Sequence, residues 1–269
     1  MMDTIMIDTV VSKLQIIRYP PRYPKSIHLY ITNECNLDCK KCYYRSPNDE
    51  KQQLSLKRLT PLFREWKKYG LTSIAIGGGE PLLHPEIFEI VELAKQLNFF
   101  IAVTTNGTIL KPIKPNRVHI SYDKLHPTWH NERLIKKAIE YYKNLGSKVG
   151  INHIVSDLKT IEYVEDNFEN VDNLLLIREK PESSFMDWYK IPRRKNYWIE
   201  GCIEGSLCEQ GVLNFHLNYN LEASICSNLK KSIPYTTLPE VWEKLKKFKC
   251  ELRDSNMKGD FDKNRFKNI

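Results

Sequence analysis

The segment IHLYITNECNLDCKKCYY, residues 27–44, begins as a strand and ends in a cysteine-rich loop. Its first part alternates apolar and other residues, with Ile27, Leu29 and Ile31 on one side, which is typical of a β-strand. Three cysteines then follow in the order C-x3-C-x2-C. Three thiolates this close together favour a soft metal ion or an iron–sulfur cluster.

The number of cysteines in this loop limits which kinds of metal site it can form. A structural zinc site or an ordinary [4Fe–4S] cluster uses four protein ligands, whereas Cys35, Cys39 and Cys42 provide three. A cubane cluster held by three cysteines leaves one iron open, and that iron can bind a substrate or a cofactor. The alternative interpretation is a zinc knuckle or a set of scattered core cysteines.

The rest of the first 180 residues alternates short strand-like runs with amphipathic helical runs, which is typical of a parallel α/β sheet or barrel. After the first strand, the expected strands cover residues 72–76, 99–103, 117–121, 148–155 and 174–177. Helices are expected in each interval where apolar residues repeat at helical spacing: around 59–66, from Pro85, around 135–142 and near Thr160. The first of these helices has two possible starts. Either Thr60 is its N-cap and Pro61 its first residue, or the helix begins earlier and Pro61 kinks it.

Boundaries between parts of the chain follow from changes in this pattern. Residues 1–25 form an N-terminal extension, 26–180 the barrel, 181–200 a linker, 201–252 a small C-terminal module and 253–269 a polar tail. Within the module we expect a hairpin over residues 212–226 that turns at 218–220, since Asn tolerates positive φ. A basic helix from Leu238 to about Lys249 follows it.

Composition restricts the class of protein further. The chain has 269 residues, seven cysteines and a formal net charge of +8. The charge favours an anionic partner or, alternatively, reflects a solvated lysine-rich surface. The absence of a secretion signal argues against a disulfide framework. No apolar run is long enough to cross a bilayer, so we predict a cytoplasmic protein with no membrane partner.

The cysteine loop CNLDCKKCYY resembles the cluster loop of the radical S-adenosylmethionine (SAM) superfamily. The resemblance implies a [4Fe–4S] cluster whose open iron binds the amino and carboxylate groups of SAM. It further implies that an electron from the cluster breaks a sulfur–carbon bond and releases a 5′-deoxyadenosyl radical, which abstracts hydrogen from the substrate. The family usually has an aromatic residue before the third cysteine, where this chain has Lys41, so Tyr43 or Tyr44 is expected to pack near the adenine.

The second expected strand ends in Gly78-Gly79-Glu80-Pro81, which resembles the GGEP motif that binds the amino group of SAM in this family. Glycines allow close approach of the backbone, and a carboxylate accepts hydrogen bonds from an ammonium group. All four residues are therefore candidates for SAM binding.

Later strand ends resemble the MoaA/PqqE-like branch, which implies a partial (β/α)6 TIM barrel carrying a small C-terminal twitch/SPASM-like appendage of a β-hairpin plus a helix. The segment at 104–107 is similar to the TTNG motif, and the segment at 121–123 to an S-x-D motif. The candidate SAM-binding residues in these strand ends are Thr105, Asn106, Ser121 and Asn152. The ordinary alternatives are a turn at Asn106 and a helix cap at Asp123.

Three residues are candidates for the catalytic step: Asp123, Arg178 and Cys250. Asp123 belongs to the S-x-D motif, and Arg178, at the end of the sixth strand, suits a carboxylate or phosphate. Cys250 is either a thiol that donates a hydrogen atom or a fourth ligand of an auxiliary cluster. His126 and His130 follow the fourth strand and are further candidates for the substrate site, although an exposed or capping histidine is the commoner outcome.

Cys202, Cys208 and Cys226 lie beyond the barrel, around the expected hairpin. This arrangement resembles the twitch or truncated SPASM appendage, which carries an auxiliary iron–sulfur cluster in many relatives. The alternative is that these cysteines are buried and inert.

Three classes of function remain open at this point. The first is a radical SAM enzyme that modifies a peptide or small metabolite, with flavodoxin or ferredoxin as electron donor. The second is a radical SAM enzyme that acts on RNA or a nucleotide, which the charge favours although no nucleic-acid-binding motif is present. The third is a non-enzymatic iron–sulfur or zinc protein, which leaves the GGEP-like and TTNG-like segments unexplained.

Overall fold

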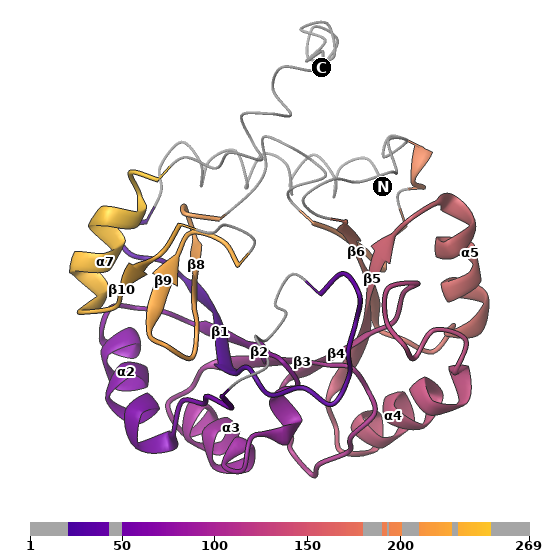
Figure 1. Ribbon diagram of the computed structural model, residues 1–269, viewed down its shortest axis with the longest axis horizontal. Helices are drawn as coiled ribbons and strands as arrows, with labels where there is room; N and C mark the ends of the chain where they lie inside the picture. Colours follow the sequence, from indigo (N-terminus) through magenta and orange to yellow (C-terminus); the bar gives the residue numbers. More distant parts are fainter. Residues whose placement is uncertain are drawn as a thin grey trace, which may run out of the picture.

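The computed structural model describes residues 21–42, 50–179, 190–192, 194–200, 210–227 and 231–248. These residues form one curved ten-stranded sheet, and the helices lie along its outer side (Figure 1). The strand order is β10-β9-β8-β1-β2-β3-β4-β5-β6-β7. Within the described residues, every helix is too short or too polar to span a bilayer.

The first six strands pair in parallel and in sequence order, as a partial TIM barrel requires. They are β1 (Ser26–Thr32), β2 (Ser73–Gly78), β3 (Phe100–Thr105), β4 (Arg117–Ser121), β5 (Lys148–Val155) and β6 (Asn173–Arg178). The helices among them are α2 (Leu56–Lys68), the short 3-10 helix η1 (Pro81–Leu83), α3 (Ile87–Gln96), α4 (Glu132–Asn144) and α5 (Leu158–Asn167). The predicted α/β fold is confirmed, although the described segment between β3 and β4 contains no helix.

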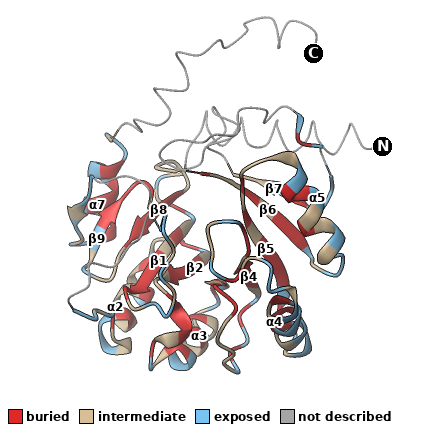
Figure 2. Cartoon of the chain, turned by 45° about the vertical axis from the view of Figure 1, so that its right-hand side comes forward, coloured by how far each residue is buried: buried red, intermediate tan, exposed pale blue. Residues whose placement is uncertain are grey.

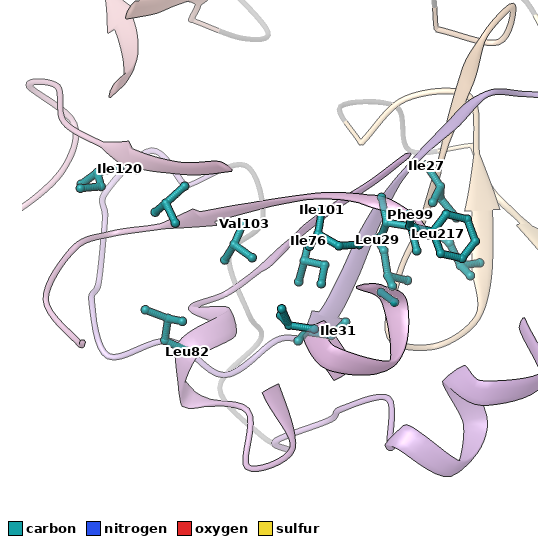
Figure 3. Packing of buried hydrophobic residues seen from close by; sticks show 14 of the residues in the cluster. Ile27, Leu29, Ile31, Ile76, Leu82, Phe99, Ile101, Val103, Ile120 and Leu217 are labelled. Carbon is teal, nitrogen blue, oxygen red and sulfur yellow. The ribbon is translucent and has the colours of Figure 1, made fainter. Parts of the chain in front are cut away.

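Alternation along the strands separates two faces of the sheet. Ile27, Leu29 and Ile31 of β1 are fully buried and pack with residues of β2, β3 and η1 beneath the helices (Figure 3). Much of each central strand is buried (Figure 2), but the face that lines the barrel interior carries residues of intermediate exposure such as Ser121 and Asn152. The apolar core thus lies between sheet and helices, and the interior face keeps polar groups accessible.

The starts of two helices are settled by the structure. The helix α2 begins at Leu56, so Pro61 lies inside a longer helix, which was the second of the two alternatives, and does not start it. The Thr60 hydroxyl donates to the Leu56 carbonyl at 2.8 Å. The helix α3 begins at Ile87 and not at Pro85, because η1 and a turn precede it.

The C-terminal segment continues the barrel sheet. The predicted hairpin is present as β8 (Asn214–Leu217) and β9 (Glu222–Ser224), followed by β10 (Ile233–Pro234) and α7 (Leu238–Leu245). The strand β8 pairs in parallel with β1, so the appendage joins the same sheet. The interval expected as a linker also contains a strand, β7 (Tyr197–Ile199), which pairs with β6.

A buried hydrogen-bond cluster fastens the C-terminal segment to α2. The Tyr235 hydroxyl donates to Glu65 Oε2 at 2.8 Å and accepts from Trp66 Nε1 at 2.8 Å. The other oxygen of Glu65 accepts the Leu238 N–H at 2.9 Å. One carboxylate and one indole therefore hold both β10 and the start of α7.

We predict that Tyr235→Phe lowers the free energy of unfolding by about 1–3 kcal/mol, because it leaves the buried Trp66 N–H without an acceptor. Urea unfolding of wild type and variant measures this. Tyr141→Phe is the control, since that hydroxyl forms no hydrogen bond within the described residues. Equal stability losses in the two variants would contradict the prediction.

Candidate active site

Because β1–β6 are parallel, their carboxyl ends meet at one mouth of the barrel. The cysteine loop leaves β1 and extends across this mouth toward β4 (Figure 1). Asn36 Nδ2 donates to Thr108 Oγ1 beyond β3 at 2.8 Å. Lys41 Nζ lies 2.5 Å from Glu179 Oε1 beyond β6. The loop is therefore tied to two distant strand ends.

The three thiols of the loop lie close together and remain accessible. Cys35 and Cys42 are exposed and Cys39 is partly buried. Burial is the largest cause that raises the pKa of Cys39 to about 12, and the neighbouring charges of Cys42 and Cys35 add to it. As thiolates they repel one another, and cationic iron relieves this repulsion. The residues present fit a cluster held by three cysteines.

A single metal ion fits this loop less well. No three His, Cys, Asp or Glu side chains in the described part of the chain converge on one ion position. A cubane cluster does not need such convergence, since each thiolate binds a different iron. Three cysteine ligands therefore suit a cluster with one open iron better than a structural zinc ion, which uses four protein ligands.

The glycines at the end of β2 are required by the chain's own backbone. A Cβ on Gly78 would lie 2.3 Å from the Thr32 carbonyl oxygen, and one on Gly79 would lie 2.2 Å from that of Glu34. The Gly79 N–H donates to Thr32 O at 2.9 Å, and the Glu80 N–H donates to Glu34 O at 2.7 Å. The sequence led us to expect that these glycines let the backbone approach SAM. In the structure they also let the backbone of β2 approach the start of the cysteine loop.

The Glu80 side chain is fully buried and its carboxylate accepts three hydrogen bonds from the protein. Oε1 accepts the Leu82 N–H at 3.0 Å and the Thr105 hydroxyl at 2.9 Å. Oε2 accepts the Asn106 N–H at 2.7 Å. Burial raises the pKa of Glu80 to about 7, and these hydrogen bonds oppose the shift. The carboxylate joins the ends of β2 and β3, a role that differs from the expected ammonium contact, while Pro81 begins η1.

Ser121 and Asn152 are neighbours across β4 and β5. Asn152 Oδ1 is buried and has no hydrogen-bond partner in the described residues. An acceptor left without a partner fits a ligand that supplies a donor, such as a ribose hydroxyl. The pair therefore suits part of SAM.

Asp123 caps the turn after β4 and also lies near the cysteine loop. Its Oδ1 accepts the Leu125 N–H at 2.9 Å, and its charge contributes to the raised pKa of Cys39. His126 Nδ1 lies 3.0 Å from Oδ2. His130 is placed elsewhere, with Nδ1 at 3.2 Å from the Tyr163 hydroxyl. The structure brings Asp123 near the cluster loop and His126 against Asp123, whereas His130 lies against Tyr163.

Arg178 lies on the other face of its strand. It is spaced by two residues from the buried Leu176 and by four from the buried Leu174, so it shares the helix-covered face of β6 and not the interior face. Its N–H donates to Glu200 Oε2 at 3.2 Å, and its Nε is buried without a hydrogen-bond partner among the described residues. The expected contact of Arg178 with a carboxylate or phosphate stays a prediction.

Glu179 is a residue of the site that sequence reasoning missed. It is 8% exposed and pairs with Lys41, at the position where the family usually has an aromatic residue. The lysine itself was the available signal, since a cation in the cluster loop can pair with a carboxylate of another strand end. Of the site residues that the sequence predicts, four lie outside the described residues: Tyr43, Cys202, Cys208 and Cys250. Cys226 is described and buried.

Comparison with known proteins agrees with this site. Residues 29–187 match the radical SAM superfamily. The chain belongs to this superfamily. The match covers the cysteine loop and every strand end described above, and it confirms the predicted enzyme class, for which the superfamily implies a [4Fe–4S] cluster and SAM.

Sequence relatives place the chain near one branch of the superfamily. It is 33% identical over 150 residues to a probable GTP 3′,8-cyclase of Methanococcus aeolicus, covering 49% of this chain and 50% of that protein. A second probable GTP 3′,8-cyclase, from Methanothermobacter thermautotrophicus, is 32% identical over 127 residues, or 44% and 42% of the two chains. The chain spans about half the length of these relatives or less. The MoaA-like resemblance is confirmed.

Solved structures show the same fold at low identity. Streptococcus suis SuiB bound to precursor peptide SuiA matches with a TM-score of 0.69 at 15% identity, over 88% of this chain and 70% of that chain. The AdoMet-bound anSMEcpe matches with a TM-score of 0.59 at 17% identity, over 86% and 82%. These likenesses support the partial barrel.

We predict that Gly79→Ala lowers stability by about 1–3 kcal/mol through overpacking and clearly reduces the iron bound per chain, because the new Cβ displaces the start of the cysteine loop. Iron analysis after anaerobic reconstitution and thermal unfolding measure the two effects.

Gly146→Ala is the matched control. Gly146 has a φ of +88°, but a Cβ there meets no atom within 4 Å, so this variant carries backbone strain without touching the loop. The prediction fails if both variants retain full iron, or if both lose it equally.

Proposed function

We propose that this chain is a radical SAM enzyme that binds a [4Fe–4S] cluster through Cys35, Cys39 and Cys42 and uses it to activate SAM for hydrogen abstraction from a peptide or small metabolite. When bound, the cluster would supply one electron to SAM, and SAM would supply the sulfur–carbon bond whose cleavage forms the radical. An external donor such as flavodoxin or ferredoxin would supply that electron to the cluster. The remaining work, binding and orientation, belongs to the protein.

One observation carries this proposal: the three-cysteine loop is held by backbone hydrogen bonds against Gly79 and Glu80 at the barrel mouth. A general metal-binding protein does not need this second strand end. Backbone groups at Gly78–Pro81 lie beside the loop, where the amino group of SAM would meet the open iron. Ser121 and Asn152, further round the mouth, would hold another part of the same molecule.

The remaining candidates take supporting roles in this proposal. Thr105 and Asn106 border the SAM position from β3. Tyr43 would pack against the adenine. Asp123, whose carboxylate is buried, would take part in the catalytic step beside the loop.

We further propose an auxiliary iron–sulfur cluster bound by Cys202, Cys208 and Cys226, with Cys250 as a fourth ligand or as a thiol that donates a hydrogen atom. The support is the position of the hairpin. Cys226 follows β9, and β8 of the same hairpin pairs with β1, the strand that leads into the cysteine loop. Two clusters in this arrangement would share one wall of the barrel.

We predict that anaerobically reconstituted wild type binds two clusters and that the Cys35/Cys39/Cys42 triple alanine variant keeps one. Each [4Fe–4S] cluster adds about four irons per chain. EPR of the reduced protein should change on addition of SAM in wild type only, because the strand ends proposed to bind SAM lie beside the cluster on Cys35, Cys39 and Cys42.

The alternatives give different results. One SAM-responsive cluster that is absent from the variant would remove the auxiliary site and keep the radical SAM enzyme. Zinc in place of iron, or no response to SAM in wild type, would contradict the proposed function.

A nucleotide substrate is the second candidate. The relatives named probable GTP 3′,8-cyclase and the net charge of +8 favour it. Both observations are consistent with recognition of a triphosphate by basic side chains.

We predict that the reduced enzyme forms 5′-deoxyadenosine faster in the presence of its substrate class than with SAM alone. GTP, other nucleoside triphosphates and mixed peptides are compared, each in deuterium-labelled form. Deuterium in 5′-deoxyadenosine from labelled GTP would select the nucleotide. Deuterium from labelled peptide, with none from any nucleotide, would exclude it.

A further inference from the structure

A tight turn joins the second and third cysteines of the loop. The Cys42 N–H donates to the Cys39 carbonyl oxygen at 3.1 Å, which is the hydrogen bond of a β-turn. Lys40 and Lys41 are the two central residues of this turn, and both are exposed. The part of the loop that carries these two thiols therefore also carries two neighbouring cations.

Only one of the two lysines has a partner. Lys41 Nζ lies 2.5 Å from Glu179 Oε1, just beyond the end of β6. Within the described residues, this ion pair is the only hydrogen bond or ion pair that either of these two side chains forms. The side chain of Lys40 forms none there. The contact is therefore specific to one position of the turn.

The two partners of the ion pair differ strongly in exposure. The side chain of Lys41 is 64% exposed, whereas that of Glu179 is 10% exposed. An ion pair between two exposed residues contributes little to stability. A buried carboxylate that loses its cation is instead left desolvated and without compensation. Removing the lysine should therefore cost more stability than removing the carboxylate, because an unpaired lysine stays in water.

The ion pair connects distant parts of the barrel mouth. The loop leaves β1 and Glu179 follows β6, and four strands lie between these two in the sheet. A second contact holds the other end of the loop, where Asn36 Nδ2 donates to Thr108 Oγ1 at 2.8 Å. The loop is thus restrained beside Cys35 by Asn36 and beside Cys42 by Lys41.

We propose that the Lys41–Glu179 ion pair positions Cys39 and Cys42 for the cluster and slows the loss of the cluster, with Lys41 and Glu179 as positioning residues. Thiolates that are held in place before iron binds need less ordering when the cluster forms. Without the ion pair the turn moves more freely, and a chelator competes better for the iron. The inference rests on the proposed function, since it needs the cluster on these cysteines.

The test compares wild type with Lys41→Met, Glu179→Gln, the double variant that carries both changes, and Lys40→Met. Lys40→Met is the matched control, because it removes the same charge from the same turn without breaking a contact. Each protein is reconstituted anaerobically and mixed with an excess of a ferrous-iron chelator, and the rate of iron release is followed at low and high salt.

Two further measurements separate the causes of iron release. The iron released by the Cys35/Cys39/Cys42 triple alanine variant is subtracted, so that only the three-cysteine cluster is counted. Urea unfolding of each apoprotein is measured by itself, so that a change in stability is distinguished from a change in cluster retention.

We expect the two single variants and the double variant to lose the cluster at similar rates, roughly fivefold or more faster than wild type, because all three lack the same single interaction. Lys40→Met should release iron as wild type does. High salt should speed release in wild type and not in the double variant, since salt screens an ion pair that has an exposed partner. In urea, Lys41→Met should be the least stable, because it alone leaves the carboxylate of Glu179 unpaired.

Three results would overturn this inference and leave the proposed function in place. The first is iron release at the wild-type rate in Lys41→Met and Glu179→Gln. The second is a double variant in which the effects of the two changes multiply, since the residues would then act separately. The third is equal acceleration by Lys40→Met, which would assign the effect to the charge of the turn. A wild type that binds no iron would overturn the proposed function itself.

Discussion

The site depends on one steric constraint, the contact between the end of β2 and the backbone that enters the cysteine loop. At Gly79 a Cβ would lie 2.2 Å from the Glu34 carbonyl oxygen, a distance that no other residue type can accept without movement. Glycine there lets two consecutive N–H groups bond to the incoming strand. Because the loop starts from a fixed position, its later residues reach across the mouth to Thr108 and Glu179.

The buried carboxylate of Glu80 also fixes the end of the next strand, β3. It follows the two glycines directly, and its burial next to Thr105 and Asn106 joins β2 to β3. The ends of three strands are therefore positioned as one unit. The apolar face beneath the helices keeps the strands themselves in register, as the packing of Ile76, Ile101 and Val103 shows (Figure 3).

The sequence predicted those features that are encoded locally. Alternating residues located β1 and β4, and the cysteine spacing and the Gly-Gly-Glu-Pro segment indicated a cluster loop and its companion strand end. Features that depend on contacts between distant residues were not predictable in this way. Lys41 and Glu179 are 138 residues apart, and the parallel pairing of β8 with β1 has no local signal.

Two candidate residues have surroundings that their sequence motifs did not indicate. Glu80 was expected to face SAM, but three nearby donors enclose its carboxylate. Arg178 was expected at the mouth, but the pleat of β6 turns it to the covered face. A motif gives the position of a residue along a strand, whereas the side on which its functional group lies depends on the strand's register and neighbours.

The pairing of β1 with both β2 and β8 has a consequence for how the chain folds. β1 begins near residue 26, and its second neighbour spans Asn214–Leu217, so during synthesis one edge of β1 stays open while almost two hundred further residues emerge. An open edge strand can pair with another chain, and so distant a pairing forms slowly. The strand that leads into the cysteine loop is therefore among the last parts of the sheet to be enclosed.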